Sequence, residues 1–166
     1  EREILEARKS IRIMRQIISE VLNIVSSATS FNAIGNKIGI SHYVVEEYLE
    51  ILDDLFALKI AYWKDSQQVS FRKEKKIFFR DPFIFRAFSL ISNKEIKREA
   101  LLEHIVQEHL YRKFGEIYYF KNSYEIDCIA GNLKIEVKAG KPHRKYPRGV
   151  RILEEQDIPK FLIELF

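Results

Sequence analysis

The spacing of apolar residues changes its period partway along the chain. From Ile4 to Ile24, and again from Val44 to Leu55, apolar side chains recur at helical spacing. Between residues 117 and 139 apolar and polar side chains alternate as they do in strands. Helical and strand-like stretches that follow one another predict helices packed on a sheet. We therefore expect an α/β (α+β) fold with two domains, at residues 1–74 and 75–166.

Composition narrows the class of protein further. The chain has 166 residues, of which 46% are hydrophobic, so it can bury a core. No apolar run approaches the ~20 residues that cross a bilayer, so we expect a soluble protein without a membrane partner. The single cysteine, Cys128, excludes an internal disulfide and indicates a cytoplasmic location. Because the first residue is Glu1 rather than Met, we expect a piece of a longer protein.

The first half shows three helical segments followed by a strand pair. A short helix near Asn32–Ile38 ends at Gly39, and Ser41 is a good N-cap for the third helix. Two strand-like runs, 60–64 and 69–73, are joined by a polar turn. This order resembles a winged helix-turn-helix domain. The resemblance implies DNA binding, with the third helix in the major groove.

The charges of the third helix oppose that role. No Lys or Arg occurs between Ser41 and Leu58, whereas this stretch carries Glu46, Glu47, Glu50, Asp53 and Asp54. Carboxylates repel the phosphate backbone of DNA. We therefore favour a protein-packing role for this helix over groove reading, which remains the alternative.

Aromatic and acidic residues mark the start of the second half. Asp81-Pro82 indicates the start of a helix, and we expect the phenylalanines around it to pack in the core: Phe79, Phe83, Phe85 and Phe88. A long helix is expected over about 94–114. On it, Glu99, Glu103 and Gln107 recur every four residues and so share one face.

Three strands are expected next, at 117–120, 124–130 and 133–139. If Gly131-Asn132 forms a two-residue turn, Ala130 lies opposite Leu133, and Asp127 lies opposite Glu136. Opposed carboxylates destabilise a strand pair, but a divalent cation reverses that repulsion. A nearby lysine, Lys138, can then orient the attacking water or a phosphate.

The order of these residues resembles the PD-(D/E)XK nuclease core, in which a helix carboxylate precedes Asp and Glu-x-Lys on strands. The resemblance implies that Asp127 and Glu136 are ligands of Mg²⁺ or Mn²⁺, with Glu103 as a further ligand. It also implies that Lys138 is the catalytic base or stabilises the phosphate.

A narrower resemblance, from about Ile17 onward, is to the C-terminal region of archaeal-type ATPases that carry a nuclease-like tail. It rests on the winged-helix pattern followed by four motifs, namely Arg80-Asp-Pro, Leu101-Leu-Glu-His-Ile-Val, Glu125-Ile-Asp and Ile135-Glu-Val-Lys. The resemblance implies DNA and an N-terminal ATPase domain as partners, and it leaves oligomerisation open. No Gly-rich phosphate loop of an ATPase occurs in this sequence.

The chain departs from the nuclease pattern after Lys138. The core normally continues with a second helix, but 139–148 is too short and contains Pro142 and Pro147. We expect a truncated core in which a basic loop replaces that helix, followed by a strand at 150–154 and a closing segment at 159–166. The loop cations expected to contact DNA are Lys141, Arg144, Lys145 and Arg148. The missing helix favours an alternative function, a catalytically inactive interaction or regulatory module.

Other polar residues support no further site. His104 and His109 are five residues apart and diverge on a helix, so they do not form a zinc site. Cys128 is expected to be buried, and core packing is the default for Tyr62 and Trp63.

Overall fold

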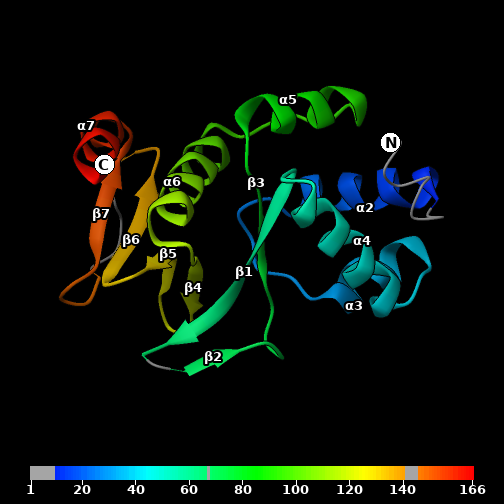
Figure 1. The fold of residues 1–166 in the computed structure, drawn as a ribbon, viewed down its shortest axis with the longest axis horizontal. Coiled ribbons are helices and arrows are strands. Elements are labelled where there is room, and N and C mark those ends of the chain that lie inside the picture. Colours follow the sequence, from blue (N-terminus) through cyan, green and yellow to red (C-terminus); the bar gives the residue numbers. More distant parts are fainter. Residues whose placement is uncertain (1–9, 67, 141–145) are drawn as a thin grey trace. The chain divides into compact units, whose positions relative to one another are not determined.

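The computed structural model describes residues 10–66, 68–140 and 146–166 (Figure 1). The protein has a mixed α/β fold, as the change of period predicts. It divides into two compact units: the described residues up to Ile60 with Glu74–Ile96, and Ala61–Lys73 with Lys97–Phe166. The domain boundary expected after residue 74 stays a prediction. No helix in the described ranges is both long and apolar enough to cross a membrane.

The helices of the first unit begin at side chains that cap them. Ser10, Ser30 and Ser41 each accept a hydrogen bond from the backbone N–H three residues on, at 3.0–3.4 Å. The Ser41 cap is the one that the sequence predicts. The helices of this unit are α2 (Ile11–Asn23), α3 (Phe31–Ile38), α4 (His42–Asp54) and α5 (Pro82–Ile91).

Gly35 lets the turn after α3 pass close to the helix. Its carbonyl accepts a hydrogen bond from the Ile40 N–H at 3.0 Å. A Cβ placed on Gly35 would lie 2.5 Å from the Ile40 carbonyl oxygen, which is backbone and cannot turn aside. The junction between α3 and α4 therefore requires glycine at this position.

We expect Gly35→Ala to destabilise the protein by about 1–3 kcal/mol, because the added methyl group overpacks this junction. Helix propensity alone would predict the opposite change in stability, because it favours alanine over glycine by ~1 kcal/mol. Urea unfolding measures the difference. Asn36→Ala, at the adjacent exposed position of α3, is the control and should change little. Equal stability of the Gly35 variant and wild type would contradict the close approach.

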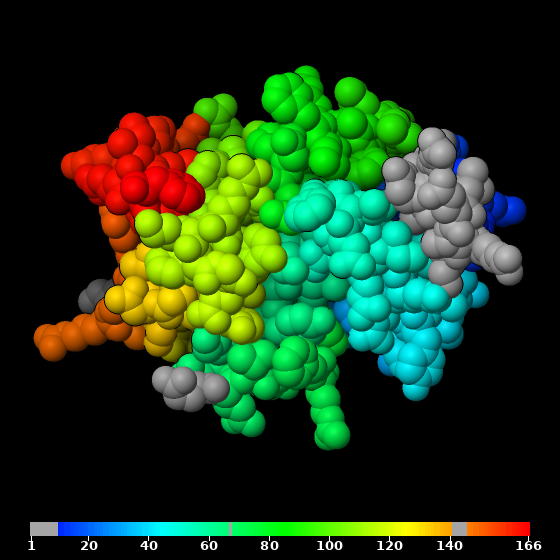
Figure 2. Space-filling view, in the orientation of Figure 1, coloured from blue at the N-terminus to red at the C-terminus, as the bar shows by residue number. Residues whose placement is uncertain are grey.

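The phenylalanines around α5 divide between core and surface. Asp81 caps α5 by accepting from the backbone N–H groups of Phe83 and Ile84. Phe79 and Phe85 are buried and stack with ring centroids 5.0 Å apart. The core expectation is wrong for Phe83, which is 84% exposed. Phe83 and Phe85 are two residues apart, which is a rotation of ~200° about the helix axis, so only one of them can face the core. The atoms of α5 are among those coloured green in Figure 2.

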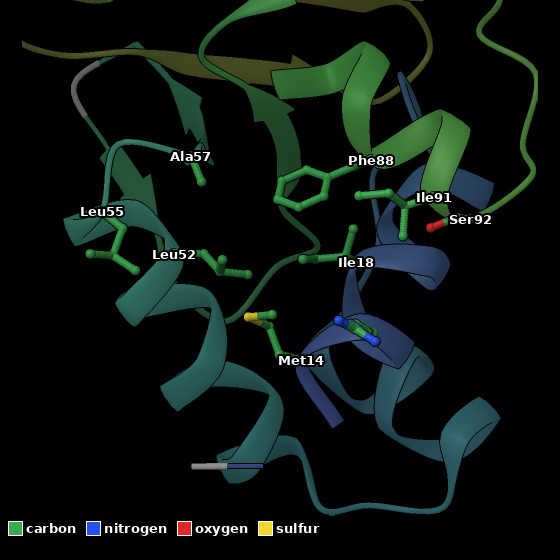
Figure 3. A pocket seen from close by; sticks show the side chains of 9 residues that line it. Met14, Ile18, Leu52, Leu55, Ala57, Phe88, Ile91 and Ser92 are labelled. Carbon is green, nitrogen blue, oxygen red and sulfur yellow. The ribbon is translucent and has the colours of Figure 1, made fainter. Parts of the chain in front are cut away.

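An apolar cavity of about 340 Å³ lies within the first unit. Side chains of α2, α4 and α5 point into it, as Figure 3 shows for Met14, Leu52 and Phe88. Arg15 and Ser92 are the polar side chains in its lining. Leu55 and Ile91 in this lining are exposed, so the hollow is open to solvent.

A mixed sheet forms the second unit, in the order β2-β1-β4-β5-β6-β7. Strand β1 runs parallel to β4, the neighbours from β4 to β6 are antiparallel, and β7 is parallel to β6. The strands are β1 (Leu58–Asp65, which starts in the first unit), β2 (Gln68–Ser70), β4 (Tyr118–Lys121), β5 (Glu125–Ala130), β6 (Leu133–Lys138) and β7 (Arg151–Glu154). The strands expected from residue 117 onward are therefore confirmed to within about two residues.

Two helices complete the second unit. α6 (Arg98–Phe114) packs on β5 and β6, and α7 (Ile158–Leu165) packs on α6 after a short 3-10 turn (Figure 1). In the part of 139–150 that is described there is no helix between β6 and β7. This agrees with the shortened connection expected from Pro142 and Pro147.

The strand pair predicted as a wing belongs to this sheet. Tyr62 of β1 is the ladder partner of Tyr118, and Trp63 is that of Tyr119. Trp63 is buried, and its Nε1 donates a hydrogen bond to the Lys121 carbonyl at 3.1 Å. Core packing is thus confirmed for Trp63. Strand β3 (Lys76–Phe79), which pairs with β1, was not predicted, because its four residues lie inside an aromatic passage without alternation.

Candidate active site

The hairpin β5–β6 has the register that its turn predicts. Ala130 pairs with Leu133, and Cys128 pairs with Ile135. At the next pair along the hairpin, Asp127 and Glu136, hydrogen bonds from backbone N–H groups to side chains take the place of backbone ladder bonds. The Asp127 N–H donates to Glu136 Oε2 at 3.2 Å, and the Val137 N–H donates to Asp127 Oδ2 at 2.9 Å. Each carboxylate is therefore held by the backbone of the opposite strand.

Glu136 is the centre of a buried polar group. Only 2% of Glu136 and 6% of Asp127 is exposed. Lys138 Nζ lies 2.7 Å from Glu136 Oε1, and the Tyr146 hydroxyl donates to the same oxygen at 2.8 Å. Lys138 Nζ is also 4.0 Å from Glu99 on α6. The fold thus brings Asp127, Glu136 and Lys138 together, as expected.

Burial dominates the acid–base behaviour of this group. Burial, followed by the charge of Asp127, raises the pKa of Glu136 to about 7, although hydrogen bonds from Lys138 and Tyr146 oppose the rise. Burial also raises the pKa of Tyr146, and its hydrogen bond to Glu136 adds to the rise. Burial would lower the pKa of Lys138, but the hydrogen bond and charge of Glu136 outweigh it and the pKa is raised. Near neutral pH Glu136 is therefore only partly ionised.

Helix α6 contributes Glu103 and Gln107. Both are buried, at 4% and 1% exposure. Gln107 Nε2 donates to Glu103 Oε1 at 3.1 Å and to the backbone carbonyl of Asp127 at 3.4 Å. Glu103 is therefore linked to strand β5 through the Gln107 side chain. Across the described ranges, no three His, Cys, Asp or Glu side chains are grouped so that they could hold a metal ion.

The oxygen atoms at this site are nevertheless of the type that a hard divalent cation binds. Asp127 and Glu136 offer carboxylate oxygens, which Mg²⁺ prefers, and this ion often needs only one or two carboxylates besides water. Gln107 Oε1 is buried and accepts no hydrogen bond within the described part of the chain. An oxygen in this state is available to a cation. The residues present therefore fit Mg²⁺ or Mn²⁺ in type.

The predicted DNA contacts are described only in part. Lys141, Arg144 and Lys145 lie outside the described residues, and Arg148 is exposed. A hollow of about 410 Å³ adjoins the end of β6, lined by Ala139, Gly140 and the segment 154–156. Since Glu154 is the ladder partner of Lys138, this hollow lies beside the candidate site.

Sequence reasoning missed Tyr146 as a member of the site. It lies in a loop with no periodic pattern, and the tyrosine before Pro147 carries no signal for contact with β6. The expectation that Cys128 is buried is confirmed. His109 Nδ1 contacts the Ile105 carbonyl of its own helix at 2.8 Å.

Fold and site define a mixed α/β protein with a buried carboxylate–lysine group on one sheet. A family model described as "Domain of unknown function (DUF8612)" matches residues 2–95, and the chain belongs to this family. The match ends before α6, so all residues of the candidate site lie beyond it. Searches of curated proteins and of solved structures find no match.

Proposed function

We propose that the second unit is a nuclease-like module, a phosphodiesterase that depends on a divalent cation and acts on DNA. The observation that carries this proposal is the buried pair Asp127 and Glu136 on adjacent strands, with Lys138 beside Glu136. The element order supports it, because a helix, three antiparallel strands and a strand parallel to the last agree with the PD-(D/E)XK core that the sequence resembles. A second core helix is missing from the described part of 139–150.

Each residue has a proposed role. Asp127 and Glu136 would hold Mg²⁺ or Mn²⁺, and Glu103, which is not grouped with them closely enough for all three to bind one ion directly, would be an outer ligand. When bound, such a cation polarises a phosphate oxygen and makes a water more acidic. The ammonium of Lys138 binds a phosphate oxygen or orients the water, and the Tyr146 hydroxyl holds Glu136 in place.

DNA is the proposed substrate, and the basic loop with Lys141, Arg144, Lys145 and Arg148 is its proposed contact. Cations of this kind bind the phosphate backbone without regard to sequence. Groove reading by α4 gains no support, since its exposed face carries Glu47, Glu50 and Asp54. The resemblance to archaeal-type ATPases further suggests an N-terminal ATPase domain as partner. A DNA substrate and a buried thiol suit a cytoplasmic location.

A second candidate function is a catalytically inactive interaction or regulatory module. The observation that favours it is the closed network around Glu136, in which Lys138 and Tyr146 occupy Oε1 and the Asp127 N–H occupies Oε2. A cation would have to compete with these partners. In this alternative, the carboxylate pair stabilises the sheet only through its hydrogen bonds.

Cation binding tests the proposed function. Millimolar Mg²⁺ or Mn²⁺ should raise the melting temperature, because a ligand at ~100 times its Kd stabilises the folded state by ~2.7 kcal/mol. The double variant Asp127→Asn, Glu136→Gln should lose this rise. Asp157→Asn with Glu164→Gln removes the same charge at exposed positions of the second unit and should keep it. A wild-type melting temperature that does not respond to either metal would contradict the site.

A further inference from the structure

The buried side-chain amide of Gln107 has one polar atom that no neighbouring group within the described ranges satisfies. Its Nε2 donates to two acceptors, Glu103 Oε1 and the Asp127 carbonyl. Because both neighbours accept and neither donates, the orientation of the amide is determined, and Oε1 is the end without a partner. This oxygen is inaccessible to solvent and accepts no hydrogen bond from any described residue.

An unsatisfied buried oxygen costs folding free energy, and native structures retain one mainly where a ligand or water satisfies it. An apolar residue of similar size would avoid this cost in a helix that only packs on the sheet. Position 107 also lies one turn after Glu103, on the face of α6 that covers β5 and β6. Through Nε2 the same side chain contacts Glu103, proposed as an outer ligand, and the backbone of Asp127, proposed as a ligand.

We propose that Gln107 Oε1 is a ligand of the divalent cation, either directly or through one bound water; this inference rests on the proposed function. Amide oxygens are ordinary ligands of hard cations, and two carboxylates with one amide oxygen and waters suffice for Mg²⁺ or Mn²⁺. The Nε2 of the same side chain holds Glu103 by a hydrogen bond. Gln107 thus supplies one ligand and orients another.

Two variants of one residue test the inference. Gln107→Leu keeps the approximate size of the side chain and removes its polar atoms, whereas Gln107→Glu keeps an oxygen at the same position. Isothermal titration with MgCl₂ and MnCl₂ measures affinity, and urea unfolding without metal measures the stability of each variant. We expect Gln107→Leu to weaken cation binding about 10- to 100-fold. Gln107→Glu keeps a ligand oxygen but loses the Nε2 donor to Glu103 and to the Asp127 carbonyl, so it should bind the cation more tightly than Gln107→Leu.

The outcomes separate this inference from the proposed function. If wild type and Gln107→Leu bind Mg²⁺ equally, the ligand role of Gln107 is wrong and the carboxylate site stands. If Gln107→Leu loses affinity together with stability in the absence of metal, the residue supports the fold rather than the cation, and the inference is overturned. If wild type binds neither metal, the proposed function itself fails. Weakened binding by Gln107→Leu, with unchanged or higher stability without metal and tighter binding by Gln107→Glu than by Gln107→Leu, supports the inference.

Discussion

Lys138→Ala is expected to abolish metal-dependent cleavage of DNA while leaving cation binding largely intact. Lys138 Nζ lies 2.7 Å from Glu136, and its charged form is favoured because its pKa is raised. An ammonium in this position can serve the attacking water or the phosphate without being a ligand of the metal. Loss of one donor that stabilises charge in the transition state costs about 100- to 1,000-fold in rate, so we expect a loss in that range.

The assay uses labelled single-stranded, duplex and branched DNA with Mg²⁺ or Mn²⁺. Lys134→Ala is the matched control, because Lys134 lies on the same strand but is exposed and near the hairpin turn. It should leave the cleavage rate unchanged. If neither wild type nor Lys138→Ala cleaves any of these substrates, the inactive module is the better description. Lys138 then acts as an ion-pair partner of Glu136, and its removal affects stability alone.

Local signals were sufficient to predict much of the second unit. The Gly131-Asn132 turn determines the register of β5 and β6, and a side-chain period of two then places Asp127 and Glu136 together. Helix starts were predictable for the same reason, since Ser41 and Asp81 satisfy N–H groups only a few residues away. These features depend only on residues close together in the sequence, so they could be predicted without the structure.

Features that depend on distant segments were not accessible. The parallel pairing of β1 with β4 joins residues more than fifty positions apart, and nothing in the run around Trp63 indicates that it continues a sheet. Tyr146 reaches Glu136 from a loop, and the role of Gln107 depends on which carbonyl of β5 lies below α6. In each case the partner is set by tertiary packing, which local patterns do not encode.

The stability of the metal-free protein should respond to pH through Glu136. The pKa of this group is about 7 in the folded chain against 4.5 for the ordinary value. Below about pH 4.5 the group is protonated in both states and costs nothing. Between about pH 4.5 and 7 the unfolded chain releases the proton while the folded chain keeps it, so stability falls as pH rises. Above about pH 7 the folded chain bears the full free-energy cost of keeping Glu136 ionised while buried, which is on the order of 3 kcal/mol.

Glu136→Gln isolates this contribution, because glutamine keeps the shape of the side chain without a charge to bury. We expect the variant to match wild type near pH 4.5 and to exceed its free energy of unfolding by about 2–3 kcal/mol at about pH 8. In wild type, Glu136 contributes to the raised pKa values of Lys138 and Tyr146, so the variant removes this contribution as well. Urea unfolding at several pH values, with metal removed by chelation, measures the difference. A difference between the two proteins that stays constant with pH would show that the pKa of Glu136 is not raised in the folded chain.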